Sequence, residues 1–523
     1  MNEPIQYPVQ NRLPPLPGQV RFGGKRRDMI FAGLLFLFSL LAANFCLWAG
    51  FGLGAAVAAI GLFLTGLIYI RPCCRRVTAY GIALICLYFL CALSMIFSDG
   101  AEWPVIAAMI ILSALTVTEL LALRRWPAGS LYAVGDWCHM AFACSFGRLN
   151  RTFFALLHKE NPDGSLQKRK IGGIILGVVC AVPVTAAAAV LLMFSDAAFE
   201  NLVEYITFDR LGEIFGTLVI GTFLFLLLFG QYFAAMHQER NPEKGKARNG
   251  YAEPSVLIAF LTVLCIVYVL YLFSQLAYFF SAFSGILPEN FTVAEYARRG
   301  FFEMGLVSLI NLAVIGISAF LVRKKKEKLP ASIKAFSLFL CVFSLLLIGT
   351  ALSKMVLYIH TYGMTRARIF TSVFMVFLAV VFLAAALRIF LQKLPYMKAA
   401  VIAGAVLAAA LCFADADRVT AAYNVDAYLS GKLETIDMYE LQGLRSDAVV
   451  PYVWKLREDP EVSDMAYLIL NEKMEKLGLW DSENNRPAEK PKYDWRSFNL
   501  PEYAAFRQLR EAAAEIHQKS SGG

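Results

Sequence analysis

Residues 254–282 read P-S-V-L-I-A-F-L-T-V-L-C-I-V-Y-V-L-Y-L-F-S-Q-L-A-Y-F-F-S-A, and this run contains no Asp, Glu, Lys or Arg. About 20 apolar residues in a helix are enough to cross the hydrocarbon layer of a membrane. The run therefore predicts a transmembrane helix. The fold class of the chain depends on how often such runs recur.

The overall composition also indicates a membrane protein. The 523 residues are 58% hydrophobic and 17% charged, whereas soluble domains average about 45–50% apolar and about 25% charged residues. A net charge of +9 would elsewhere suggest a nucleic-acid partner. Here the basic residues lie in short loops between apolar runs, so we expect membrane lipids and no nucleic acid as partners.

Apolar runs of this kind recur from residue 29 to residue 414, which predicts an all-α, polytopic transmembrane helix bundle. No cleavable signal peptide is expected, because the segment 1–28 is polar and Pro-rich and the first run is long enough to stay in the membrane. The last predicted span is the shortest of the set. The eleven predicted spans are 29–48, 51–70, 79–97, 103–123, 171–194, 215–236, 254–282, 301–322, 335–353, 369–391 and 399–414.

The positions of Lys and Arg predict the orientation of the chain. Segments that would share a side with the N-terminus carry 29 of these residues, and the short loops on the other side carry 6. Because positive residues are retained in the cytoplasm, the N-terminus is predicted to be cytoplasmic and residues 415–523 extracytoplasmic. None of the 11 cysteines follows Cys412, which suits a domain in an oxidising space.

Spans, loops and charge together predict five regions. The loop 124–170 has basic flanks, and Val134, Trp137, Ala141 and Cys144 recur in it at helical spacing. It is predicted to be a helix that either lies on the inner leaflet or packs on the bundle. The regions are a cytoplasmic tail 1–28, a four-span segment 29–123, the loop 124–170, a seven-span core 171–414 and an extracytoplasmic domain 415–523.

The C-terminal domain 415–523 is predicted to be all-helical. Apolar residues fall at helical spacing between Val419 and Tyr428, and again in residues 448–456, 465–477 and 498–516. Asn499 is the expected N-terminal cap of the last helix. The domain has 20 acidic and 14 basic residues, so its net charge is opposite to that of the preceding chain.

A polar cluster is predicted where the domain would meet the membrane. In F-T-V-A-E-Y-A-R-R-G-F-F-E-M (291–304), Glu295, Arg299 and Glu303 share one helix face. A carboxylate inside a span needs a cation, so Glu303 is expected to pair with Arg299, Arg366 or Arg368. The predicted outer-interface cluster comprises Asp196, Glu295, Arg298, Arg299, Glu303, Asn311, Lys354, His360, Tyr362, Arg366 and Arg368.

This cluster has two interpretations. Its residues are ordinary interfacial anchors, or they form a binding surface for the C-terminal domain or for a partner. The loop 354–368 is basic with no acidic residue, whereas the domain is acidic. We therefore predict that the helix near Asp417–Tyr428 docks on this loop and on the start of the 301–322 span.

A-E-Y-A-R-R-G-F-F-E (294–303) resembles a motif of an uncharacterised family of bacterial multi-pass membrane proteins with a C-terminal domain of unknown function. Four further stretches resemble the same family more weakly: F-S-D-A-A-F (194–199), Y-G-M-T-R-A-R (362–368), D-R-V-T-A-A-Y-N-V-D-A-Y (417–428) and D-W-R-S-F-N-L (494–500). The resemblance covers roughly residues 165–515. It implies the membrane fold but no activity and no site residue.

Recognisable reaction chemistry is missing from the sequence. The five histidines are scattered, and no Walker loop, dinucleotide fingerprint or His-Glu-x-x-His occurs. We predict no catalytic, cofactor-binding or metal-binding residue. Phe51-Gly-Leu-Gly54 is interpreted as a helix-packing motif, and Glu119 is expected to reach toward Arg124.

Three function classes fit these observations. The first is a non-enzymatic envelope scaffold or sensor that displays the helical domain outside, with envelope or signalling proteins as partners. The second is a secondary transporter, which should show internal repeats of spans. The third is a membrane enzyme acting on lipids or envelope precursors, which should show convergent reactive groups at one membrane level.

Overall fold

The computed structural model is almost entirely helical. By contacts it divides into two units, one of residues 1–40 and 142–237 and one of residues 41–141 and 238–523. Two short antiparallel strand pairs, His158–Glu160 with Leu166–Lys168 and Trp480–Asp481 with Arg486–Pro487, are the exceptions to the predicted helical pattern. The structure describes residues 25–74, 77–99, 102–121, 133–138, 158–160, 166–168, 177, 188, 211–236, 252–284, 301–322, 329–391, 394–481, 486–488 and 495–521.

The predicted fold class is confirmed: the chain is an all-α, multi-pass integral membrane protein. Within the described residues, 9 helices are long and apolar enough to span a membrane, and a shorter apolar helix covers Pro104–Leu120. The expected span 171–194 lies, except for two single residues, outside the described part. The nine are Arg26–Trp48, Leu53–Cys73, Ala79–Phe97, Gly212–Phe233, Pro254–Ser274, Glu303–Leu321, Ala331–Tyr362, Arg366–Phe390 and Tyr396–Ala414.

Helices α13 (Ala331–Tyr362) and α15 (Tyr396–Ala414) differ from their predicted spans in length. The shortest expected span, 399–414, is the 19-residue helix α15. Helix α13 has 32 residues and continues through most of the expected loop 354–368. Its last turns contain polar residues but no helix breaker, and it ends only at Gly363, whose φ of 78° is left-handed. The loop between α13 and α14 (Arg366–Phe390) is therefore only residues 363–365.

The first unit contains most of α1 (Arg26–Asn44) and helix α9 (Leu211–Met236). Aromatic rings pack between them: Phe31 stacks on Phe229 with ring centroids 5.8 Å apart, and Phe36 meets Phe225 edge-on at 5.4 Å. Gly221 allows close approach, because a Cβ there would lie 2.8 Å from the Leu40 side chain. The strands β1 (His158–Glu160) and β2 (Leu166–Lys168) belong to the same unit.

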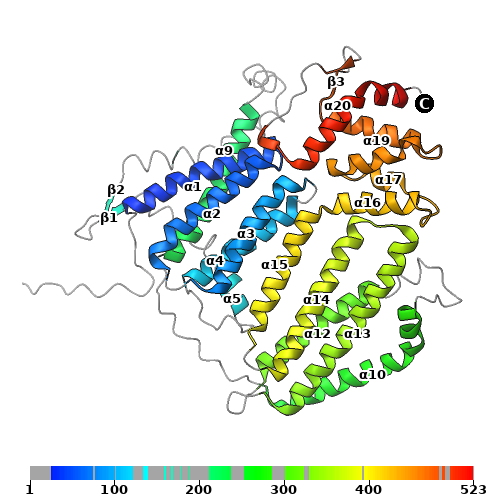
Figure 1. Ribbon diagram of the computed structural model, residues 1–523. Coiled ribbons are helices and arrows are strands. Elements are labelled where there is room, and N and C mark those ends of the chain that lie inside the picture. Colours follow the sequence, from blue (N-terminus) through cyan, green and yellow to red (C-terminus); the bar gives the residue numbers. More distant parts are fainter. Residues whose placement is uncertain are drawn as a thin grey trace, which may run out of the picture. The chain divides into compact units, whose positions relative to one another are not determined.

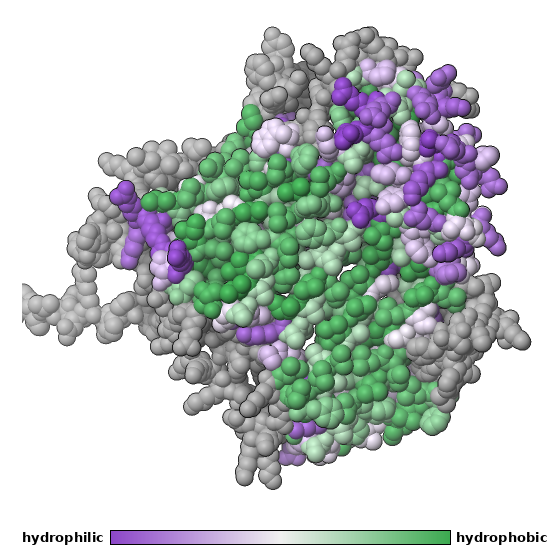
Figure 2. Space-filling view, viewed as in Figure 1, coloured by the Kyte–Doolittle hydropathy of each residue, from purple (hydrophilic) through white to green (hydrophobic). Residues whose placement is uncertain are grey.

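The second unit holds the other membrane helices and the C-terminal helices. α13 packs against α10 (Pro254–Ser284), α12 (Phe301–Leu321) and α14, and α15 joins α14 to α3 (Ala79–Phe97) (Figure 1). α3 in turn packs on α2 (Leu53–Ile70) and α4 (Glu102–Leu120). Hydrophobic side chains cover these helices, whereas hydrophilic ones gather over the C-terminal helices (Figure 2). The outward residues of α10 are large and apolar, as lipid contact requires.

The loop 124–170 is described only in its short helix α5 (Ala133–Cys138) and in the strands β1 and β2. Trp137 of α5 packs against the hydrophobic cluster formed by α2, α3 and α4. This contact favours packing on the bundle for that turn. The remainder of the predicted amphipathic helix lies outside the described residues.

Asn311 joins three membrane helices. It is fully buried in the middle of α12, accepts from Tyr268 Oη of α10 at 2.7 Å and donates to Ser344 Oγ of α13 at 2.9 Å. We expect Asn311→Leu to destabilise the bundle by about 1–2 kcal/mol, because it removes two interhelical hydrogen bonds that contribute about 0.6 kcal/mol or more each in a membrane. Ser308→Ala is the control, since the bond that Ser308 makes among the described residues lies within its own helix, to Met304 O. Equal unfolding midpoints of the two variants in detergent would contradict this role.

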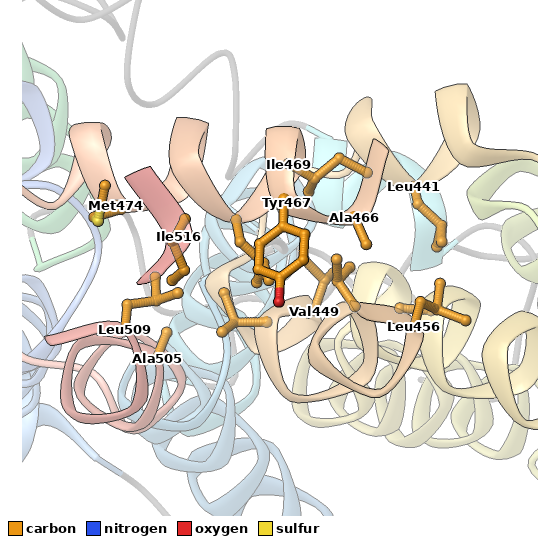
Figure 3. Packing of buried hydrophobic residues seen from close by; sticks show 14 of the residues in the cluster. Leu441, Val449, Leu456, Ala466, Tyr467, Ile469, Met474, Ala505, Leu509 and Ile516 are labelled. Carbon is orange, nitrogen blue, oxygen red and sulfur yellow. The ribbon is translucent and has the colours of Figure 1, made fainter. Parts of the chain in front are cut away.

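The C-terminal helices have a hydrophobic core of their own (Figure 3). α16 (Ala416–Leu429), α17 (Met438–Gln442), α19 (Ser463–Lys476) and α20 (Leu500–Ser521) surround it. The predicted helices near 419–428, 465–477 and 498–516 are confirmed. The cap is also confirmed, because Asn499 Oδ1 accepts from Glu502 N at 2.8 Å. Residues 448–456 are not one helix: α18 (Val450–Val453) has Pro451 in its first turn and a 3-10 turn on each side.

Candidate functional site: the docking surface of the C-terminal domain

The turn between α13 and α14 is bound directly by α16. Asn424 of α16 accepts from Met364 N at 2.6 Å and donates to Met364 O at 2.9 Å. Gly363 permits this approach, because a Cβ there would lie 2.6 Å from Asn424 Oδ1. One amide side chain thus satisfies both backbone groups of a residue 60 positions earlier in the chain.

Arg366, at the start of α14, forms the charged part of this contact. Its Nε lies 3.1 Å from Asp417 Oδ1, and its Nη2 donates to Gly443 O at 2.9 Å. The Asp417 side chain is fully buried. The prediction that the helix near Asp417–Tyr428 docks on the basic loop is therefore confirmed. The described residues give no support for its second half, docking on the start of the 301–322 span.

Four aspartates surround the loop that follows α17. Asp417 Oδ2 accepts from Arg445 N at 2.7 Å and from Ser446 N at 3.0 Å. Asp99, just after α3, accepts from Ser446 Oγ and, at 2.7 Å, from Asp447 N. We call Asp99, Asp415, Asp417, Ser446 and Asp447 the aspartate junction. It ties the ends of α3 and α15 to the C-terminal domain.

Asp415 makes the connection from α15 to α16 in a single residue. Its φ of 54° is the only left-handed value at a non-glycine residue in the described part of the chain. Such a conformation costs free energy and persists only when the surroundings fix it. Asp415 Oδ1 caps α16 by accepting from Asp417 N and Arg418 N, and its Oδ2 lies 2.6 Å from Ser446 Oγ.

Two lysines of α19 contact the loop that contains Ser446 and Asp447 of the junction. Lys473 Nζ donates to the carbonyl oxygens of Leu444, Arg445 and Ser446 at 2.8–3.1 Å and lies 3.2 Å from Asp447 Oδ1. Lys476 Nζ lies 3.0 Å from the same carboxylate oxygen. Burial lowers the pKa of Lys473 even though Asp447 is beside it. The junction is therefore a buried, hydrogen-bonded network rather than a set of exposed surface charges.

A second contact holds the segment before α20 on the start of α2. Leu53 N donates to Phe498 O at 2.8 Å. A Cβ on Gly52 would lie 2.4 Å from Ser497 O, and one on Gly54 would lie 2.9 Å from Arg496 O. We call this the glycine dock. The Phe-Gly-Leu-Gly motif thus accommodates the backbone of the C-terminal segment, which differs from the predicted packing of two membrane helices.

An ion pair joins α4 and α15 at the ends of these helices that lie away from the aspartate junction. Glu119, near the end of α4, accepts from Thr78 Oγ1 at 3.0 Å and lies 3.6 Å from Lys398 Nζ of α15. Lys398 also sits over the Tyr80 ring, with Nζ 4.5 Å from its centroid. Arg124, the expected partner, lies outside the described residues.

The structure gathers only part of the predicted cluster. Arg366 binds Asp417, and Arg368 lies over the Tyr358 ring, with its guanidinium 4.0 Å from the centroid. Glu303 is exposed, and among the described residues it forms no ion pair with Arg366 or Arg368; Arg366 binds Asp417 instead. The alternative partner, Arg299, lies outside the described residues, so that part of the expectation stays a prediction. Lys354, His360 and Tyr362 lie in the last turns of α13, and Asn311 lies mid-helix. Asp196, Glu295, Arg298 and Arg299 lie outside the described residues.

Several residues of the docking surface were not predicted from the sequence: Asp99, Asp415, Ser446 and Asp447 of the junction, and Asn424, Lys473 and Lys476 beside it. Local signals marked some of them: Ser98-Asp99-Gly100 follows a span, and Asp415 directly follows the last span. No spacing rule connects residue 99 with residue 446. These contacts depend on which helix ends become neighbours in the fold.

The fold and this site define a class: an integral membrane protein with a helical C-terminal domain bound to the ends of its membrane helices. A family model described as "Domain of unknown function (DUF4153)" matches residues 79–453, so the chain belongs to this family. No curated protein and no solved structure matches the chain.

The matched region begins at residue 79, well before the predicted start of the resemblance at residue 165, so the segment 79–164 is part of the family region. The whole aspartate junction lies inside the match. The glycine dock and the two lysines of α19 lie outside it.

Proposed function

We propose that this protein is a non-enzymatic envelope sensor or scaffold of a bacterial plasma membrane, in which the C-terminal domain is the external working part. The observation that carries the proposal is the ion pair between Arg366 of the membrane helices and the buried Asp417 of the aspartate junction. A domain held by a buried, hydrogen-bonded network moves with the helices to which it is bound. A partner on the domain and a change in the bundle can therefore influence each other.

The contacts between helix ends support the predicted assignment of the loops to two opposite sides of the membrane. In the predicted topology, the points after the first, third, ninth and eleventh spans are all external. Gly52, Asp99, Arg366 and Asp415 come from these points, and all four contact the C-terminal domain or lie at its start. Thr78, Glu119 and Lys398, which the topology assigns to the cytoplasmic side, also meet each other.

The orientation predicts a labelling result. Tyr439 is 79% exposed on the domain, so a membrane-impermeant thiol reagent added to intact cells should label a Tyr439→Cys variant above the wild-type background. Ser446 is unsuitable for this purpose because it is fully buried. A Gly164→Cys variant, in the predicted cytoplasmic loop, should react only after the cells are opened. Labelling at residue 164 but not at residue 439 in intact cells would reverse the topology.

The proposed function is tested by comparing three strains across growth and envelope-stress conditions. One lacks the gene, one makes a chain ending at residue 414, and one carries Arg366→Glu in the full chain. A sensor or scaffold requires the docked domain, so all three should show the same fitness profile while the variant proteins remain in the membrane. If the truncated chain restores wild-type fitness, or if purified full chain moves solutes in proteoliposomes, the transporter alternative replaces this proposal.

A further inference from the structure

The hydrogen-bond geometry of the aspartate junction requires one more proton than the Ser446 hydroxyl supplies. Ser446 Oγ lies within hydrogen-bonding distance of Asp99 Oδ1 and 2.6 Å from Asp415 Oδ2. A hydroxyl has one proton and can donate to only one of these oxygens. If both carboxylates were ionised, the other contact would place two lone pairs against each other. A second proton is therefore required among these three oxygen atoms.

The charges around the junction leave the same two carboxylates without a cation. Asp417 is paired with Arg366, and Asp447 with Lys473 and Lys476. Glu502 of α20, also nearby, interacts with Asn499. Among the described residues, neither Asp99 nor Asp415 forms an ion pair. Five acidic side chains thus meet three basic ones, and two neighbouring carboxylates that cannot both be neutralised by cations commonly share a proton.

We propose that Asp99, Ser446 and Asp415 form a proton-binding site through which external pH controls docking of the C-terminal domain. The proposal rests on the proposed sensor function and identifies the proton as its ligand. In the docked form, protonated Asp99 donates to Ser446 Oγ, Ser446 donates to Asp415 Oδ2, and the other Asp99 oxygen accepts from Asp447 N. Loss of the proton to water leaves Asp99 charged and removes its bond to the serine oxygen.

The electrostatics of Asp99 agree with this arrangement. Burial, and then the carboxylates of Asp447 and Asp415, raise the pKa of Asp99 from 3.8 to about 7. Because the docked form holds the proton more tightly than an undocked Asp, docking is strongest at low pH. It weakens by up to about tenfold per pH unit as pH rises from about 4 to about 7, and it is constant above that.

The substitution Asp99→Asn reproduces the protonated state. An asparagine amide donates to Ser446 Oγ through its nitrogen and accepts from Asp447 N through its oxygen, so every bond of the neutral acid is retained. Asp464→Asn is the matched control, because Asp464 is exposed in the first turn of α19. Hydrogen-exchange protection of residues 444–449, corrected for the intrinsic effect of pH, reports docking. Residues 466–474, in the core of the domain, serve as the internal reference.

In the wild type and in Asp464→Asn, we expect protection of 444–449 to fall at least tenfold between pH 5 and pH 8. In Asp99→Asn it should stay at the low-pH level throughout. An infrared band from a protonated carboxyl should be present in the wild type at pH 5 and disappear as pH rises, which tests the site even if the variant fails to fold. Protection that does not change with pH in the wild type, or that changes equally in Asp99→Asn, would overturn the proposal while leaving the docked domain intact. Protection of 444–449 absent at every pH would instead show that the docking, and with it the proposed function, is wrong.

Discussion

Gly52→Leu should release the segment before α20 from the membrane helices. Even the first side-chain carbon would lie 2.4 Å from Ser497 O and 2.8 Å from Phe498 O, and both neighbours are backbone atoms that cannot rotate away. Overpacking of this kind costs about 3 kcal/mol, which corresponds to an increase of about 100-fold in the undocked population. Trypsin cleavage after Arg496 measures this population when opening is fast.

The control for this experiment is Gly33→Leu, since nothing lies within 4 Å of a Cβ built on Gly33. Its cleavage rate after Arg496 should equal that of the wild type. Unchanged cleavage in Gly52→Leu would mean that the glycine dock does not form in the membrane.

Asp417→Ala should have a comparably large effect at the aspartate junction. The substitution removes the acceptor of Arg445 N and Ser446 N and leaves the Arg366 guanidinium without its carboxylate. A buried donor left without an acceptor costs about 1–3 kcal/mol, and the two backbone groups carry most of the effect because the Arg366 side chain is 35% exposed. Asp417→Asn should be milder, since the amide oxygen still accepts from the two backbone groups.

Asp426→Ala is the matched control on the same helix. Asp426 forms an ion pair with Lys455 at 2.8 Å, but both side chains are exposed, and such pairs contribute about 0–1 kcal/mol. The measurement is the urea concentration at which α16 loses hydrogen-exchange protection in purified protein. A similar midpoint for Asp417→Ala and Asp426→Ala would show that burial at the junction carries no energetic weight.

The sequence was sufficient to predict features that depend on local composition. Charge-free runs identify membrane helices because the hydrocarbon layer imposes both length and polarity. Helix α16 and the Asn499 cap follow from spacing and from one side chain, respectively. The approach of the C-terminal domain to the α13–α14 turn followed from opposite charge and a short tether at residue 414. In each case the physical cause lies within a few residues of the feature, or in a gross charge difference.

The specific contacts could not be predicted in this way. Arg366 was one of three arginines expected to bind Glu303, yet Asp417 binds that arginine. The contact of Asp99 with Ser446 joins residues 347 positions apart, and Gly52 meets Ser497 across a similar separation. Such pairings depend on how α3, α15 and α2 are arranged, and a single sequence contains no periodic signal for that arrangement.

Exchange of the Met364 backbone amide tests the central claim, that the C-terminal domain is bound to the membrane-helix ends, most directly. This N–H lies in the turn between two membrane helices and donates to Asn424 Oδ1 of the domain. In the wild type it should therefore exchange slowly, and Arg366→Glu, which places a carboxylate beside Asp417, should accelerate its exchange at least tenfold. Fast exchange of Met364 in the wild type, unchanged by Arg366→Glu, would contradict the docked arrangement.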